Sequence, residues 1–220
     1  MTHKTFVFTA VFLAAVIMSP AAYGQELPDG PIRFEIGGAP GGGMFLTGGD
    51  DDAEVNFNVY TFSAYVDYYL TQKVAVEGEY LFGNGRGQDI VFRNGLVIGQ
   101  QLPFSSNFTG GLLFYPTGAT GSRLPFYFSG GVGQMSLIAR PTTLKVGYDP
   151  DGTNSASFIV SRIGAGVKIP RRASAPNWAF RIDYRLMFVN PNDGAPAFFA
   201  RDKTRTGHQL QFGISYAFRR

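Results

Sequence analysis

The sequence predicts an all-β protein, an eight-stranded antiparallel β-barrel that crosses a membrane, and three observations support this fold class. Apolar and polar residues alternate along segments of about ten residues, as in strands with one apolar face. Charged residues make up 16% of the 220 residues, against roughly 25% in an average soluble domain. No segment after the N-terminal apolar run reaches the roughly 20 apolar residues of a membrane helix, and a closed barrel is the other structure that satisfies its backbone in lipid.

The first 24 residues have the layout of a cleavable secretory signal. Lys4 precedes the uncharged run FVFTAVFLAAVIM, and small residues follow it. We expect cleavage after Gly24, which leaves Gln25 as the first mature residue and one barrel domain over 25–220. An uncleaved anchor helix is the alternative. The chain contains no Cys, so the fold has no disulfide framework.

The first three predicted strands lie close together in the chain. RFEIGG (33–38) opens the first strand, and a glycine-rich run continues it toward Leu46. VNFNVYTFSAYVDYYL (55–70) alternates between apolar and polar positions, and TQK (71–73) forms a tight turn. VAVEGEYLF (74–82) then places apolar residues on one face and two glutamates on the other. These segments predict a hairpin with one apolar and one acidic face.

The remaining five strands repeat this design. SNFTGGLLFY (106–115) and PFYFSGGVGQM (125–135) flank a turn-rich link, and SFIVSRIGAGVKI (157–169) follows. WAFRIDYRLMF (178–188) carries an aromatic or aliphatic residue at every second position, with two arginines and an aspartate between them. HQLQFGISYAF (208–218) alternates in the same way. Each segment predicts a strand with one apolar face and one polar face.

The links between the predicted strands alternate in length. The short links are 71–73, 116–124 and 170–177, and the mostly longer ones are 48–54, 83–105, 138–154 and 190–207. Short turns at one end and long loops at the other are typical of transmembrane β-barrels. The even strand number then places both termini on the short-turn side.

Aromatic residues collect at the strand ends on the short-turn side. They are Tyr68, Tyr69, Phe114, Tyr115, Phe126, Tyr127, Trp178, Tyr216 and Phe218. Amphipathic rings prefer the boundary between membrane and water, so this set predicts an aromatic girdle. A soluble aromatic core is the alternative, but the charged opposite faces favour the girdle.

Charged residues occupy the face opposite the apolar one. The predicted inward set is Arg33, Glu35, Asp67, Glu77, Glu79, Arg162, Lys168, Arg181, Asp183 and Arg185. Five basic and five acidic groups nearly neutralise one another, as buried charges must. The interior of an eight-stranded barrel is only wide enough for its side chains. We therefore expect an ion-paired plug rather than the alternative, a narrow water-lined pore.

Three segments carry a resemblance to a known family. SAYVDYYLTQKVAVEGEYLFGNG, LPFYFSGGVGQM and QLQFGISYAF resemble the small outer-membrane β-barrels of the OmpA/OmpX type. The resemblance covers nearly the whole mature chain and implies a location in the outer membrane of a Gram-negative cell envelope. It also implies outer-membrane lipids, lipopolysaccharide and the barrel-insertion machinery as partners. Such chains usually end on an aromatic residue, whereas Arg219 and Arg220 follow Phe218 here.

The resemblance implies a non-enzymatic structural or surface-interaction role carried by external loops. A small diffusion channel, a soluble secreted barrel with a buried ligand and a lipid-modifying enzyme are the alternatives. The enzyme hypothesis rests on His208, the only histidine after the signal. Its neighbours are Gly207 and Gln209, and no serine stands two positions further on. The acidic stretches 50–52 and 149–154 could bind Ca²⁺, but acidic residues are common in turns. We expect no catalytic residue, no cofactor, no metal ion and no nucleic-acid partner.

Overall fold

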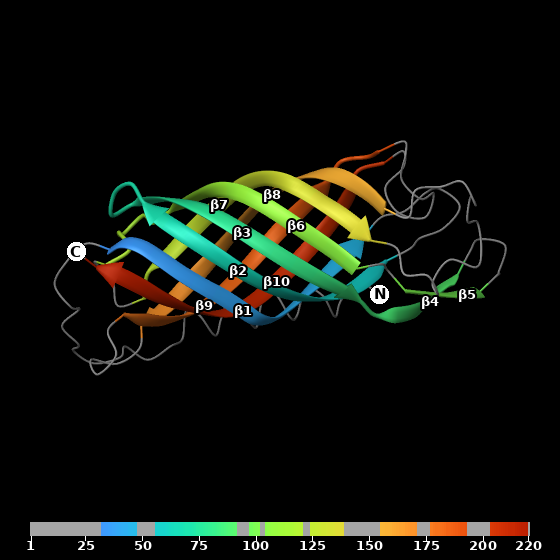
Figure 1. Ribbon diagram of the computed structural model, residues 1–220, viewed down its shortest axis with the longest axis horizontal. Coiled ribbons are helices and arrows are strands. Elements are labelled where there is room, and N and C mark those ends of the chain that lie inside the picture. The colour runs from blue at the N-terminus through green and yellow to red at the C-terminus, as the bar shows by residue number, and fades with distance from the viewer. Residues whose placement is uncertain are drawn as a thin grey trace.

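The computed structural model shows a closed antiparallel barrel with a small hairpin at one end (Figure 1). It describes residues 32–47, 56–91, 97–101, 104–120, 124–138, 155–170, 177–192 and 203–219, with only the backbone in 88–91 and 97–101 and at Ile138 and Ser155. The signal peptide predicted over 1–24 and the start of the barrel domain at Gln25 lie outside these residues, as do the acidic stretches 50–52 and 149–154. No helix in the described ranges is long and apolar enough to cross a membrane.

Eight strands form the barrel, and the prediction of an all-β, eight-stranded antiparallel closed barrel is confirmed. They are β1 (Ile32–Thr47), β2 (Phe57–Tyr69), β3 (Val74–Gly85), β6 (Phe104–Phe114), β7 (Phe126–Ile138), β8 (Ser155–Pro170), β9 (Trp178–Val189) and β10 (Arg205–Arg219). Barrel strands that follow one another in the chain pair with each other, and β1 pairs with β10 from Ile32–Arg219 to Thr47–Thr206. The closed sheet therefore has no exposed edge.

The link predicted over 83–105 is not a plain loop. It contains β4 (Gly87–Val91) and β5 (Val97–Gln101), which form a separate two-stranded antiparallel sheet. The sequence carries a signal for this hairpin, because Asn94-Gly95 separates two runs rich in β-branched residues.

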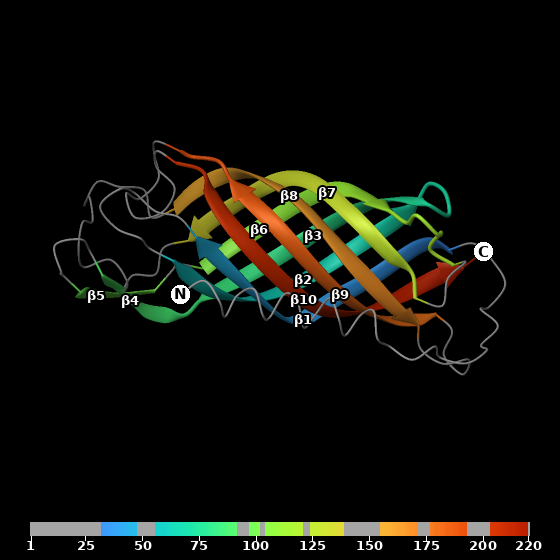
Figure 2. The ribbon, with the colours of Figure 1, turned by 180° about the vertical axis from the view of Figure 1, so that it is seen from behind.

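The two ends of the barrel differ in their connections. At one end, which we call the turn end, the backbone N–H of Leu70 donates to the Val74 carbonyl at 2.9 Å and closes the β2–β3 turn. The C-terminal end of β10 lies at the same end (Figures 1 and 2). The opposite end carries the β4–β5 hairpin, and we call it the loop end (Figures 1 and 2).

Strand β1 changes the face that its side chains present. Its register with β10 shifts between Gly38 and Gly41, and a similar shift separates it from β2. Before the shift the odd-numbered residue Glu35 is buried, and after it the even-numbered residues Met44 and Leu46 are buried. A β-bulge inserts one extra residue into a strand and so reverses its alternation.

The interior of the barrel divides into an apolar and a polar half. The loop half is filled by Met44, Leu46, Phe57, Val59, Met135, Leu137, Ala156, Phe158, Val160, Met187 and Val189, none more than 7% exposed. The turn half holds the buried charged side chains of β1, β2, β3, β8 and β9. The strand pattern thus places an apolar plug and a charged cluster in one lumen.

Candidate functional site: a filled barrel interior

The structure gathers nine of the ten predicted interior charges into one buried cluster, which we call the ion network. Its members are Glu35, Asp67, Glu77, Glu79, Arg162, Lys168, Arg181, Asp183 and Arg185, none more than 5% exposed. These residues lie on five strands, β1, β2, β3, β8 and β9, and closure of the sheet brings them together inside one lumen. Charges removed from water need partners at short distance.

Arg181 of β9 lies at the centre of the ion network. Its guanidinium contacts Asp183 at 2.7 Å on its own strand, Glu77 of β3 at 2.5 Å and Asp67 of β2 at 3.2 Å. The ring centroids of two tyrosines, Tyr65 and Tyr127, lie 4.2 and 4.9 Å from its central carbon. The guanidinium therefore has carboxylates around its edge and aromatic contacts besides, an arrangement suited to arginine.

The two glutamates of β3 are each shared between arginines. Glu77 accepts hydrogen bonds from Arg162 at 2.7 Å and from Arg185 at 3.2 Å. Glu79 pairs with the same two arginines and accepts a further bond from the Gln211 side chain at 3.2 Å. These shared contacts link β3 with β8, β9 and β10 across the lumen.

A third part of the ion network lies at the turn end, around Lys168 of β8. Its ammonium contacts Glu35 at 2.8 Å, donates to the Tyr69 hydroxyl at 2.6 Å and lies 3.5 Å from Asp67. The rings of Tyr69, Tyr115 and Tyr127 surround the ammonium at 5.2 to 5.8 Å from their centroids. Cation–π contacts of this kind gain strength when the cation is removed from water.

The turn after β6 contributes to the buried cluster that holds these tyrosines. The N–H of Ala119 donates to the Gln72 carbonyl at 2.7 Å, and Ala119 packs in the buried cluster with Tyr115. Gly118 has a φ of 86°, which only glycine adopts readily, and it lets the turn fold under the barrel. This turn therefore packs against the inward tyrosines at the turn end.

The prediction that Arg33 points inward is wrong. Arg33 is exposed, and Ile32 packs against the buried cluster at the turn end. The register of β1 against β10 shifts between Ile32 and Phe34, so alternation from Glu35 does not extend to Arg33. The ion network consequently has five carboxylates and four cationic groups, not the equal numbers predicted.

Three members of the predicted aromatic girdle also lie on the other face. Tyr69, Tyr115 and Tyr127 are buried inside the barrel. Each directly follows another predicted member in the chain, and neighbouring residues of a strand point to opposite faces, so only one of each pair can face outward. The outward members are Tyr68, Phe114, Phe126, Trp178 and Phe218, which are 41 to 48% exposed, and the half-buried Tyr216.

The sequence interpretation missed several polar residues of the interior. The inward tyrosines, Gln211 and Arg205 are all buried. Alternation along β2 puts Tyr65 and Tyr69 on the face of Asp67, but the predicted interior set contained charged residues alone. Arg205 lies at the loop end, with its central carbon 5.2 Å from the Phe57 ring centroid, and the predicted strand began after it.

His208 does not belong to the interior. It is exposed on the outer face of the barrel, and its Nδ1 lies 2.7 Å from the Tyr184 hydroxyl. Within the described ranges, no group of three or more His, Cys, Asp or Glu side chains could hold a metal ion. The ion network is therefore a set of paired charges that links five strands inside the lumen.

No family model matches the sequence, and no curated protein matches it. Solved structures of small β-barrels match the fold. The Neisserial surface protein A shares 9% identity, with 84% of this chain and 97% of that chain covered and a TM-score of 0.55. The N-terminal β-barrel domain of Pseudomonas aeruginosa OprF shares 15% identity, with 86% and 100% covered and a TM-score of 0.47. Ail of Yersinia pestis also shares 15% identity, with 87% and 100% covered and a TM-score of 0.46. The likeness to the Neisserial surface protein A shows that the two chains share the fold of a small β-barrel, the fold that the sequence resemblance implied.

Proposed function

We propose that the protein is an integral outer-membrane β-barrel with a sealed interior, exported through its N-terminal signal. In this proposal the barrel is an anchor, and the loops at the loop end act outside the cell in a structural or surface-interaction role. The observation that carries it is the distribution of side chains, which is reversed relative to a soluble protein. Large apolar residues cover the outside, whereas the turn half of the inside is charged.

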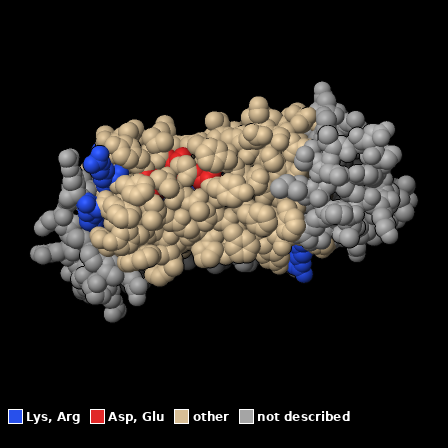
Figure 3. Space-filling view, viewed as in Figure 1, with Lys and Arg blue, Asp and Glu red and all other residues tan. Residues whose placement is uncertain are grey.

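The outer face supports a lipid environment. Large apolar side chains on three of the strands are the most exposed of the large hydrophobic residues, with Phe108 at 65%, Val132 at 64% and Ile159 at 66%. In the view of Figure 3, the Lys and Arg atoms of the described residues appear only near the two ends of the barrel. A soluble protein rarely exposes an apolar surface of this extent, and transmembrane barrels carry such a band.

The filled lumen supports an anchor rather than a channel. The apolar plug occupies the loop half, the ion network the turn half, and the tyrosines with Ala119 close the turn end. An eight-stranded barrel has no more space than such side chains need. Outer-membrane lipids, lipopolysaccharide and the insertion machinery are the partners that this proposal requires.

Folding in the presence and absence of detergent tests the membrane assignment. We expect the protein to fold only in detergent or lipid, and we expect the folded form to change its gel mobility on heating. A monodisperse, folded protein in buffer without detergent would contradict the proposal. Recording in planar bilayers tests the seal, with an established porin as the positive control. We expect no discrete conductance steps, and reproducible single-channel steps would overturn the sealed interior.

A further inference from the structure

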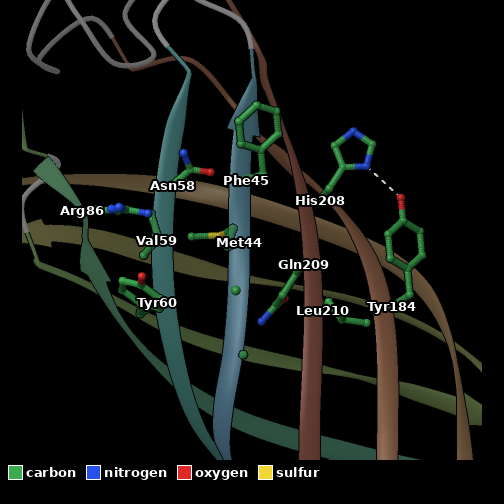
Figure 4. A pocket seen from close by; sticks show the side chains of 12 residues that line it. Met44, Phe45, Asn58, Val59, Tyr60, Arg86, Tyr184, His208, Gln209 and Leu210 are labelled. Atoms are coloured by element: carbon green, nitrogen blue, oxygen red, sulfur yellow. Dashed lines mark hydrogen bonds between the residues drawn. The ribbon is translucent and has the colours of Figure 1, made fainter. Parts of the chain in front are cut away.

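Two hollows lie end to end along the outer face of β1. The hollow nearer the loop end has a volume of about 460 Å³ and is lined by Gly43, Phe45, Tyr60, Arg86, His208 and Leu210, among others (Figure 4). The next hollow, of about 670 Å³, is lined by Ile36, Gly38, Pro40, Phe62, Trp178 and Ile214, among others. We call the two together the β1 groove.

The β1 groove exists because β1 carries small residues on its outer face. A Cβ added at Gly41 would meet no atom within 4 Å, and one at Gly43 would meet only the Val59 carbonyl oxygen at 3.9 Å. Among the described glycines only Gly118 has a positive φ, so the backbone at both positions accepts other residues. The space over β1 is therefore available to a ligand and can be filled by substitution.

The walls of the β1 groove differ in chemistry from the part of it that lies at the loop end. The walls are aromatic and aliphatic, with Tyr60 56% and Phe62 49% exposed. At the loop end, the exposed Arg86 extends from the end of β3 toward β2 (Figure 4). Among the acidic residues whose side chains the structure describes, none forms an ion pair with Arg86. The exposed His208 lies at the same end, across β1 (Figure 4). The β1 groove thus joins an apolar channel to a cationic end.

We propose that the β1 groove binds one acyl chain of a phosphorylated glycolipid of the outer leaflet, lipopolysaccharide, with its phosphate on Arg86. The inference rests on the proposed function, which places the loop end at the outer leaflet. The outer surface of a membrane barrel meets acyl chains, and a floor without side chains lets one chain contact both walls and the backbone. Arginine binds phosphate through paired, charge-assisted hydrogen bonds.

Retention of lipid by the folded protein tests this site. The full chain is placed in dimyristoylphosphatidylcholine nanodiscs containing a minor fraction of bisphosphorylated lipid A, released into detergent and weighed by native mass spectrometry. We expect the unmodified protein to retain one lipid A molecule in preference to phosphatidylcholine. Gly43→Leu fills the β1 groove and Arg86→Gln removes the phosphate contact, so each should lower the retained fraction about ten-fold.

Two matched variants are the controls. Gly110→Leu adds the same bulk at an outward glycine of β6 where a Cβ meets nothing within 4 Å, and Lys73→Gln removes an exposed charge at the turn end. Both should retain lipid A like the unmodified protein. Equal retention by all variants, equal retention of dephosphorylated lipid A, or a protein dimer in place of bound lipid would overturn the inference. If Gly43→Leu does not fold, Arg86→Gln still decides the outcome.

The proposed function and this inference fail separately. A protein that is folded and monodisperse without detergent overturns the membrane assignment. A barrel that shifts its gel mobility on heating but retains no lipid A overturns only the lipid site.

Discussion

The ring of Tyr127 occupies the space that a side chain at Gly166 would fill. The two residues are paired across β7 and β8, and a Cβ added at Gly166 would lie 2.3 Å from the Tyr127 hydroxyl oxygen. Gly37 and Tyr65 are paired in the same way across β1 and β2, and a Cβ added at Gly37 would lie 2.3 Å from the Tyr65 ring. Arg181 contacts both rings. Two tyrosine–glycine pairs thus position the aromatic neighbours of the central arginine.

Gly166→Ala should lower the free energy of unfolding by about 1–3 kcal/mol. The Tyr127 hydroxyl donates to Asp183, so the ring cannot move away without breaking a buried hydrogen bond. Urea unfolding in lipid vesicles measures the effect. Gly78→Ala is the control, because a Cβ there meets nothing within 4 Å. Equal losses in the two variants would show that the close approach of ring and backbone has no energetic role.

Arg181→Ala should lower the free energy of unfolding by about 3–5 kcal/mol, because it leaves buried carboxylates without their shared partner. Asp67, Glu77 and Asp183 all contact this guanidinium. Arg33→Ala is the matched control, since Arg33 is exposed, and its effect should stay within about 0.5 kcal/mol. The midpoints of urea unfolding compare the two variants. A small effect of Arg181→Ala would mean that water already reaches the ion network.

Adding volume to the apolar plug should also be costly. Ala156 is 7% exposed and packs in the plug on β8, so Ala156→Phe should lower the free energy of unfolding by about 1–3 kcal/mol. Ala165 lies on the same strand and is exposed on the outer face. Ala165→Phe should leave the stability unchanged or raise it, because lipid accommodates the ring. If Ala156→Phe is tolerated equally well, the loop half of the lumen is open rather than filled.

A charge on the outer face should distinguish a membrane barrel from a soluble one. Val132 is the central residue of β7 and is 64% exposed, so Val132→Arg should cost about 2–4 kcal/mol in a bilayer. Leu70→Arg places the same change at the turn end, where the cost should fall to about 0–1 kcal/mol. Reversible unfolding in lipid vesicles measures both variants. Equal, small costs would contradict a lipid-facing position of Val132.

The sequence alone predicted the strands well, because alternation is a local property. In all eight barrel strands, each observed end lies within three residues of the predicted end. The alternation of short and long links predicted that the first strand begins and the last strand ends on the short-turn side, and Ile32 of β1 pairs with Arg219 of β10 there. The β4–β5 hairpin was missed because its residues were read as part of a long loop, although Asn94-Gly95 is a hairpin signal.

The candidate site was predicted less completely, for reasons that involve single residues. Glu77 and Glu79 point inward because their strand alternates without interruption from Val74 to Gly85. The same argument predicted that Arg33 points inward, and it does not hold there because the register of β1 against β10 shifts between Ile32 and Phe34. Tyr69, Tyr115 and Tyr127 were assigned outward from the preference of aromatic rings for membrane boundaries, a preference that does not specify a face.

The sequence by itself determined the fold class, the strand positions and the residue types available for each face, because alternation along a strand is set by covalent geometry. Only the tertiary structure decided which side chains meet. Arg181 reaches Asp67 and Glu77 because the closed sheet brings β9 opposite β2 and β3. The register shifts of β1 arise from its pairing with both β2 and β10, and they decide which of its residues point inward. The small residues on the outer face of the same strand leave the space of the β1 groove. Pairing between distant strands is a property of the closed barrel, which no local pattern encodes.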